Sequence, residues 1–265
     1  MTNKIILITG AANGIGHSVA DYLLSRGDVV IPTDVDSEGL KIFEGNENAF
    51  PISMDVTNNE NIQSVVNQIK EKFGSIDCIV NNAGIFIGGP IVEIALGDFE
   101  KLIDINVLGY IRVVKAFYPL LRKGSRIINI SSEVGRIAWP FNGPYTLTKY
   151  AVEGFSDSLR RELLFKNIKV IKIQPGSINT NMMDCTKKSY KQYCEGSEFE
   201  DQMNRVWGVL EKEGYANPIY MAKTVYKAIH NKYTRFTYRV KNHRGRRLSE
   251  FIPARWLDFV LEKWV

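Results

Sequence analysis

Short apolar segments alternate with longer amphipathic ones along the first two thirds of this chain, which limits the folds that it can adopt. Several of the short segments, such as Ile5–Ile8, are apolar at every position, as expected of parallel strands that helices cover on both faces. Strand–helix–strand repetition also implies right-handed crossovers, so the sequence predicts an α/β fold around a parallel sheet. We expect strands at Ile5–Thr9, Val29–Thr33, Ala49–Met54, Cys78–Asn81, Arg126–Ser131 and Ile168–Gln174, and helices near Ile15–Arg26, Ser37–Glu44, Asn58–Phe73, Asp98–Leu121 and Pro144–Phe165.

Two later segments depart from this alternation. Residues 179–215 are a long polar stretch with one helix expected around Glu198–Lys212, and we predict a substrate lid because connections of this length are often functional lids. A helix near Ile219–Asn231 follows, and residues 235–265 form a basic C-terminal extension with a seventh strand at Arg235–Val240 and a final helix near Ala254–Trp264. No repeat or linker marks a second domain. Residues 1–265 are therefore predicted to form one Rossmann-type domain with a doubly wound, mostly parallel seven-stranded sheet and helices on both faces.

The cysteines and the hydropathy pattern fit a protein of a reducing compartment. Cys78, Cys185 and Cys194 are odd in number and irregularly spaced, which argues against a disulfide framework. Only Met1–Lys4 precede the first strand, too few residues for a signal peptide, and no apolar stretch approaches the roughly 18 residues of a membrane span. We therefore expect a cytoplasmic protein.

The positive charge of the chain is concentrated late in the sequence. The formal net charge is +5, and residues 218–265 hold eleven Lys or Arg against three Asp or Glu, so this part carries +8 and the remainder −3. Basic segments can bind nucleic acid or anionic lipid, but these residues are not interleaved as a stacking platform would require. A solvated surface with a few structural ion pairs is the interpretation that we favour over either partner.

A glycine-rich turn, Thr9–Gly16 (TGAANGIG), joins the first strand to the first helix. Glycines permit a tight turn and the close approach of a pyrophosphate at the helix N-terminus, and the position within a βαβ unit strengthens this interpretation. Asp34 stands at the end of the second strand, where a carboxylate accepts hydrogen bonds from the ribose of NAD and repels the 2′-phosphate of NADP. We predict NAD, with NADP less favoured; a helix cap is the alternative role for Asp34.

Further motifs follow in order near the ends of later strands: Asn81-Asn82-Ala83-Gly84, Asn106, Ser132, Tyr145-Thr-Leu-Thr-Lys149 and Pro175-Gly176. Together with the glycine-rich turn, this set resembles the signature of the short-chain dehydrogenase/reductase family over roughly Lys4–Thr180. Any one motif is weak, but the complete ordered set argues against a chance agreement. The resemblance implies an oxidoreductase that transfers a hydride between a nicotinamide cofactor and a secondary alcohol or ketone.

Tyr145 and Lys149 are four residues apart on a predicted helix and therefore share one face. A phenol with a pKa of about 10 is a poor base near neutrality, but an adjacent ammonium group stabilises the phenolate, which could then exchange a proton with the substrate oxygen. By the resemblance, Ser132 orients that oxygen, although hydroxyl chemistry alone does not separate it from Ser131. The resemblance also gives Asn106 a water-mediated proton relay to Lys149; a polar residue that satisfies buried backbone is the alternative.

The resemblance further implies which residues bind the dinucleotide. Asp55 and Val56 would border the adenine, while the small residues after the fourth strand would pack near the ribose. The complete predicted set is Gly10, Asn13, Gly14, Ile15, Gly16, Asp34, Asp55, Val56, Asn82, Ala83, Gly84, Tyr145, Lys149, Pro175, Gly176, Ile178 and Thr180.

Apolar side chains in the loops after the fourth and fifth strands and in the lid indicate a hydrophobic substrate, such as a steroid, retinoid or acyl-type alcohol. The same side chains could instead pack the lid against the core. Glu133 could select a substrate hydroxyl or simply face water. The predicted substrate contacts are Phe86, Phe141 and Met182, together with Ser132 and Tyr145.

The remaining expectations concern partners and rival functions. We expect no metal site, because the three histidines are far apart in the sequence. The resemblance implies a homodimer or homotetramer, to which Ala151, Gly154, Phe155 and Leu159 could contribute unless they are buried against the sheet. The rival functions are an NADP-dependent 3-oxoacyl-type reductase and a non-catalytic dinucleotide sensor on the same fold.

Overall fold

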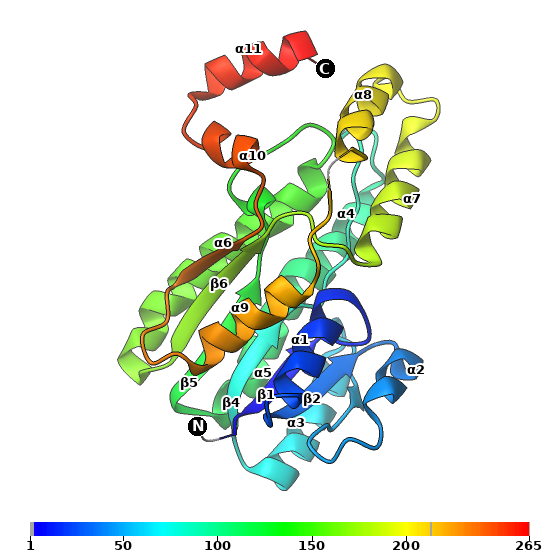
Figure 1. The fold of residues 1–265 in the computed structure, drawn as a ribbon. Helices are drawn as coiled ribbons and strands as arrows, with labels where there is room; N and C mark the ends of the chain where they lie inside the picture. Colours follow the sequence, from blue (N-terminus) through cyan, green and yellow to red (C-terminus); the bar gives the residue numbers. More distant parts are fainter. Residues whose placement is uncertain (1–2, 213, 265) are drawn as a thin grey trace.

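A seven-stranded parallel sheet forms the centre of the computed structural model, which describes residues 3–212 and 214–264 (Figure 1). The strand order is β3-β2-β1-β4-β5-β6-β7, and every neighbouring pair is parallel. The order reverses between β1 and β4, which is the point where sheets of this kind bind ligands. The predicted doubly wound Rossmann-type fold is thus confirmed. The strands are β1 Ile5–Thr9, β2 Val29–Asp34, β3 Ile52–Ser53, β4 Ile76–Asn81, β5 Leu121–Ile130, β6 Lys169–Pro175 and β7 Thr237–Val240.

Helices cover both faces of the sheet because its central strands are apolar on both sides. Ile6 and Ile8 of β1 belong to the core under α1 Gly14–Leu24 and α9 Ile219–His230. Leu7, between them, belongs to the core of the opposite face, as the two-residue period of a strand requires. That opposite face is covered by α3 Asn59–Phe73, α5 Gly109–Phe117 and α6 Gly143–Leu163.

Several predicted elements of the first half differ from the structure: β5 begins at Leu121 instead of Arg126, and α2 ends at Leu40 and is followed by a 3₁₀ turn, Lys41–Phe43. The strand expected at Ala49–Met54 is reduced to Ile52–Ser53, with an isolated bridge between Val30 and Ala49 before it. The helix expected at Asp98–Leu121 is divided into α4 Leu96–Ile103, a π-helical segment Asp104–Leu108, and α5. π-Helical turns inside helices are frequent at functional sites.

The polar segment 179–215 contains two helices, α7 Met182–Cys194 and α8 Glu200–Leu210, of which only the second was predicted. Of the three buried residues of α7, Thr186 and Ser189 are polar and only Tyr190 is hydrophobic, so its buried face is weakly marked in the sequence. Likewise, the predicted basic turn contains a short helix, α10 Arg244–Ser249, whose one buried residue is Ser249. The final helix, α11 Ala254–Trp264, is where it was predicted.

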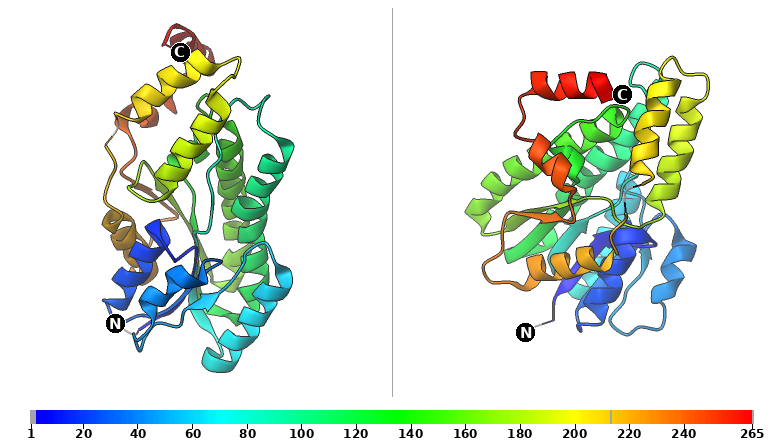
Figure 2. Two further views of the ribbon diagram at one scale, coloured as in Figure 1. Left: turned by 90° about the vertical axis from the view of Figure 1, so that its right-hand side faces the viewer. Right: turned by 45° about the horizontal axis from the view of Figure 1, so that its top comes forward.

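Helices α7, α8, α10 and α11 lie at one end of the molecule, at the top in Figure 1, and the other views place them together as well (Figure 2). The short helix α2 Ser37–Leu40 lies beside β2 and β3, at the edge of the sheet opposite to β7. Among the helices that the structure describes, none has both the length and the apolar content to cross a bilayer.

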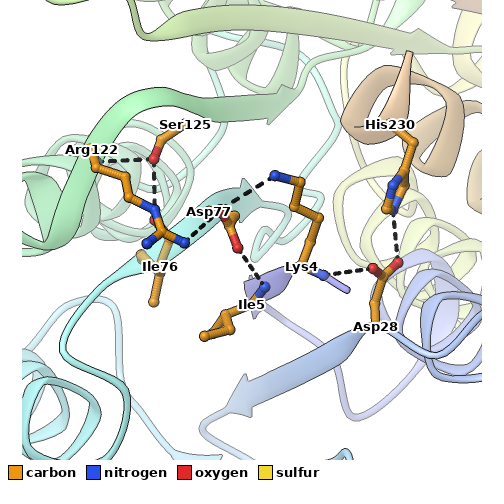
Figure 3. Close-up of polar contacts among 8 residues, drawn as sticks. All are labelled: Lys4, Ile5, Asp28, Ile76, Asp77, Arg122, Ser125 and His230. Atoms are coloured by element: carbon orange, nitrogen blue, oxygen red, sulfur yellow. Dashed lines mark hydrogen bonds and ion pairs between the residues drawn. The ribbon is translucent and has the colours of Figure 1, made fainter. Parts of the chain in front are cut away.

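Two carboxylates, the buried Asp28 and the partly buried Asp77, connect the amino ends of the central strands (Figure 3). Asp77 accepts hydrogen bonds from the Ile5 N–H at 3.0 Å, from Arg122 at 3.1 Å and from Lys4 Nζ at 3.4 Å. Asp28 accepts one from the Lys4 N–H at 3.0 Å and lies 2.8 Å from His230 Nε2. Burial by itself raises the pKa of Asp77, but the hydrogen bonds from Ile5 and Arg122 and the nearby cations outweigh it and hold the pKa below its usual value.

Replacing Asp77 tests how much these contacts contribute to folding. We expect Asp77→Asn to lower the free energy of unfolding by about 1–3 kcal/mol near neutral pH, because three donors lose an anionic acceptor. Since the folded pKa is depressed, the stabilisation is present above the unfolded value of about 3.9 and is lost as the pH falls through the folded pKa. Urea titrations at neutral and acidic pH measure both effects. The control Glu38→Gln removes an exposed pair with Lys41 and should change stability by less than about 0.5 kcal/mol; equal losses in both variants would contradict the prediction.

Candidate active site

Tyr145 lies in the first turn of α6, and Lys149 follows one turn later. The Lys149 side chain is buried, with only 4% of the residue exposed, and its Nζ lies 5.5 Å from the centre of the Tyr145 ring. The ammonium group donates to the Ile130 carbonyl at 3.0 Å, which also accepts from the Tyr110 hydroxyl at 3.0 Å. The predicted pair therefore shares one helix face and points toward the carboxyl end of β5.

The electrostatics of this pair differ from the prediction. Burial lowers the pKa of Lys149 to about 8, while the charge of Glu153, one turn further along α6, acts to raise it. Burial raises the pKa of Tyr145 well above its usual value, and a hydrogen bond with Ser132 acts in the opposite direction. The protein chain alone therefore does not lower the pKa of Tyr145, because desolvation of the phenolate outweighs its stabilisation.

The structure distinguishes the two neighbouring serines. Ser132 interacts with the Tyr145 phenol, and its Oγ accepts a hydrogen bond from the Val134 N–H at 3.3 Å. Ser131 is 1% exposed, and its Oγ has no hydrogen-bond partner among the described residues. Ser132 is therefore the serine whose hydroxyl lies beside the tyrosine.

Asn106 lies in the π-helical segment and is fully buried. Its Oδ1 accepts from the Ile85 N–H and its Nδ2 donates to the Ile85 carbonyl, both at 2.9 Å, and Nδ2 also lies 3.3 Å from Thr148 Oγ1. These contacts connect the loop after β4 to α6, as expected of a residue that satisfies buried backbone. The proton-relay role of Asn106 stays a prediction.

The glycine-rich turn packs directly against the segment that follows β4. A Cβ at Gly10, where φ is +68°, would lie 2.7 Å from the Cα of Ala83, and one at Gly16 would lie 2.0 Å from the Gly10 carbonyl oxygen. The Asn82 side chain donates to the carbonyls of Thr9 and Gly10 at 3.0 and 2.8 Å. Neither glycine can therefore carry a side chain without moving the backbone.

The N-terminus of α1 is open toward the same region. α1 begins at Gly14, and the preceding Asn13 makes no side-chain hydrogen bond to cap the helix. A Cβ at Gly14 would lie 3.3 Å from Thr180, and Ile15 lines the adjacent cavity. Helix N–H groups without a cap, beside a glycine cradle, fit the pyrophosphate of a dinucleotide.

The acidic residues predicted to bind the adenosine are all hydrogen-bonded to nearby backbone. Asp34 accepts from the Ala12 N–H at 3.0 Å and from the Asp36 N–H at 3.1 Å, so it holds the glycine-rich turn. The capping alternative for Asp34 is wrong, because Asp36 caps α2 by accepting from the Gly39 N–H. Asp55 accepts from the Thr57 N–H and hydroxyl at 2.8 and 2.7 Å, and the adjacent Val56 is buried.

A cavity of about 360 Å³ lies at the carboxyl ends of the central strands. One side is polar and contains Ser132, Tyr145 and Lys149. The Phe86 ring lies 5.0 Å from the Tyr145 ring. Phe141 is absent from the walls, because its ring packs against Phe199 at 6.1 Å. Of the predicted residues, the walls also include Asn82, Gly84, Pro175, Gly176, Ile178, Thr180 and Met182.

Beside Glu133, the C-terminal extension forms a wall of this cavity that the sequence did not indicate. Glu133 is 6% exposed; it pairs with Arg246 Nε at 2.8 Å and accepts from the His243 N–H at 3.1 Å. The alternative that Glu133 simply faces water is therefore wrong, because its carboxylate is buried against the C-terminal extension. The basic residues of the extension were the only available signal for such a partner, and sequence alone did not show where they fold back.

The described residues contain no group of three His, Cys, Asp or Glu side chains that could hold a metal ion. Cys78 is buried, and burial raises the pKa of its thiol. The three cysteines are free thiols.

This arrangement defines a dinucleotide-binding protein with a Tyr–Lys–Ser group beside an apolar cavity. Residues 4–191 match the family model described as short chain dehydrogenase, so the chain belongs to the short-chain dehydrogenase family of oxidoreductases. The family's fold binds a nicotinamide dinucleotide, which the glycine cradle accommodates.

Individual relatives are moderately similar. The chain is 34% identical over 215 residues to the 3-ketodihydrosphingosine reductase of Bacteroides thetaiotaomicron, covering 80% of this chain and 78% of that protein. It is 32% identical over 221 residues to retinol dehydrogenase 7 of Rattus norvegicus, covering 81% of this chain and 69% of that protein. Among solved structures, a short-chain dehydrogenase from Streptomyces avermitilis superposes with a TM-score of 0.80 at 25% identity, covering 99% of this chain and 95% of that chain.

The buried Lys149 should destabilise the fold near neutral pH. We expect Lys149→Met, without added dinucleotide, to raise the free energy of unfolding by roughly 1–3 kcal/mol, because an ammonium group no longer has to be buried. The folded pKa of about 8 lies below the unfolded value, which is about 10.4. Between these two pKa values the unfolded chain binds more protons than the folded chain, so the wild type gains stability as the pH rises. The difference in the free energy of unfolding between Lys149→Met and the wild type therefore shrinks over this pH range. Urea titrations over that range measure the difference.

The matched control for this experiment is Lys166→Met, which removes an exposed lysine and should change stability little at any pH. A difference between Lys149→Met and the wild type that does not vary with pH would contradict the assigned cause.

Proposed function

We propose that the chain is an NAD(H)-dependent dehydrogenase or ketone reductase that acts on a secondary alcohol or ketone of a hydrophobic molecule. The observation that carries this proposal is the placement of Ser132, Tyr145 and Lys149 on one side of a cavity that adjoins the glycine-rich turn. Family membership supports the oxidoreductase class.

In this proposal the chain's own residues position the substrate and move its proton. When bound, the nicotinamide supplies or accepts the hydride. Ser132 donates to or accepts from the substrate oxygen, and Tyr145 exchanges a proton with it. Because burial raises the pKa of Tyr145, the phenol is protonated near neutrality, which is the form that ketone reduction requires. Lys149, with a pKa of about 8, is then largely charged and favours the phenolate that remains after proton transfer.

The character of the cavity supports a hydrophobic substrate. Trp139 lies on its wall, and α7 and α8 contribute Met183, Val206, Trp207 and Leu210. Two relatives are named for 3-ketodihydrosphingosine and for retinol, and both of these molecules are largely hydrocarbon. We assign residues 179–215 the role of a substrate lid, because both of their helices line the cavity.

The preference for NAD rests on Asp34. Its carboxylate follows β2 and holds the turn that would surround the pyrophosphate. A negative charge at this place disfavours a second phosphate on the adenosine ribose.

Two further parts of the proposal concern assembly and location. Phe155 and Leu159 pack against the core, which favours burial over a subunit contact for these two residues. Exposed Leu147 and Tyr150 on α6 remain available for a homodimer or homotetramer. Free cysteines favour the cytoplasm.

Removing the Tyr145 hydroxyl tests the catalytic assignment. We expect Tyr145→Phe to lower kcat by roughly 10²–10⁴-fold, the usual cost of losing a general acid or base, while NAD binding is retained. NADH absorbance with a panel of hydroxysteroids, retinol, polyols and hydroxyacyl thioesters measures turnover, and fluorescence titration measures binding. The control Tyr150→Phe alters a half-exposed tyrosine of the same helix and should leave kcat unchanged. Full activity in Tyr145→Phe would refute the assignment.

Neutralising Asp34 tests the cofactor preference. We expect Asp34→Asn, which keeps an oxygen to accept from the Ala12 N–H, to narrow the ratio of kcat/KM for NAD over NADP by roughly tenfold or more, the effect of about 1.4 kcal/mol. Asp36→Asn, two residues further on, is the control and should leave that ratio in place. A wild-type protein that prefers NADP would overturn this part of the proposal.

A further inference from the structure

The last two helices and the turn between them carry apolar side chains that the rest of the described chain leaves uncovered. Trp256 is 65% exposed, and Phe259 and Val260 share its face of α11 at helical spacing. Leu248 of α10 is also exposed, and so are Phe251 and Ile252 in the turn between α10 and α11, where Phe251 is 79% exposed. These six residues, called here the C-terminal apolar surface, lie at the end of the molecule that α7 and α8 also occupy (Figures 1 and 2).

Positive charge surrounds this surface. Arg244, Arg247 and Arg255 are exposed, and no acid among the described residues forms an ion pair with them. Glu250 is already engaged by Arg136 and Arg239, at 2.8 and 2.7 Å. On α11 itself, Asp258 and Glu262 balance Arg255 and Lys263, so the excess positive charge beside the aromatic rings comes from Arg244 and Arg247 of α10.

We propose that α10 and α11 dock this protein on the surface of an anionic lipid bilayer. A helix with aromatic residues on one face and basic residues nearby lies in the interface of a membrane, where the apolar face enters the acyl boundary and the cations meet the lipid phosphates. Tryptophan and phenylalanine at such a face are well suited to that boundary. The docking reverses the expectation from the sequence, which favoured a solvated surface.

Charge decides between a membrane and a second copy of the chain. A two-fold contact would bury the same surface of both copies together, so the excess positive charge of Arg244 and Arg247 would be doubled in one interface. An anionic lipid surface is complementary instead, since each basic side chain near it contributes attraction.

The docked surface adjoins the proposed active site. α10 contributes Gly245 and Arg246 to the wall of the cavity, and the Arg246–Glu133 pair fastens it there. An apolar substrate dissolved in the bilayer would therefore meet the cavity beside the membrane. This last step alone rests on the proposed function; the docking does not.

Vesicle binding tests the proposal with the full chain. We expect the wild type to sediment with vesicles of phosphatidylcholine mixed with phosphatidylglycerol, to bind vesicles of phosphatidylcholine alone far more weakly, and to be released by salt. W256S/F259S should lower the partition coefficient by about tenfold or more, since two exposed aromatic rings no longer enter the interface. R244Q and R247Q should each lower it about fivefold at low salt.

Matched controls separate this surface from general stickiness. F165S removes a phenylalanine that is 90% exposed in the turn directly after α6, and K123Q removes an exposed lysine near the start of β5. Both variants should bind vesicles like the wild type. Circular dichroism melts confirm that each variant is folded, and the single-arginine variants carry the test if W256S/F259S is not. The proposal is overturned if the wild type ignores anionic vesicles, if F165S is as impaired as W256S/F259S, or if W256S/F259S abolishes a self-association instead. Because no turnover is measured, failure here leaves the proposed function untouched.

Discussion

The site depends on the close contact between the glycine-rich turn and the segment after β4. Gly10 has no room for a Cβ beside Ala83, and Asn82 fills the remaining polar positions by donating to the carbonyls of Thr9 and Gly10. The contact occurs where the strand order reverses between β1 and β4. It therefore fixes two things together: the open N-terminus of α1 and one edge of the cavity.

Burial of Lys149 is the second constraint, and it opposes stability. The ammonium group has one neutral acceptor, the Ile130 carbonyl, and a carboxylate one turn away at Glu153. Glu153 is itself held by Lys172 at 2.9 Å and by Gln174 at 2.9 Å, so its charge is shared among several cations and donors. Lys149 can therefore still be protonated although its burial disfavours the charged form, as is typical of ionisable groups at functional sites.

The sequence predicted most of the fold because the sheet is buried on both faces, and continuous apolar runs such as Ile5–Ile8 are easily recognised. It failed where helices are held by polar contacts: α7 buries Thr186 and Ser189, and α10 is held by the ion pair of Arg246 with Glu133. At the site, residue types and spacing were sufficient to bring Tyr145 and Lys149 together on α6. They could not give the pKa of the phenol, which depends on how completely the surrounding chain excludes water.

Glu133 shows most clearly what sequence could not give. Its partner Arg246 lies far along the chain, and only the path of the extension over Gly176, where a Cβ would lie 2.4 Å from the Lys241 carbonyl oxygen, brings them together. The turn that follows Ser132 thus carries a carboxylate that binds α10, and next to it Arg136, which binds Glu250 beyond α10. In one pair the turn supplies the acid, Glu133, and in the other it supplies the base, Arg136. Because exchanging the partners would bring like charges together, the two pairs fix where α10 lies along the turn as well as how far from the turn it lies. The C-terminal extension is therefore a part of the cavity wall. Through Arg246, α10 contacts Glu133, the residue that directly follows Ser132.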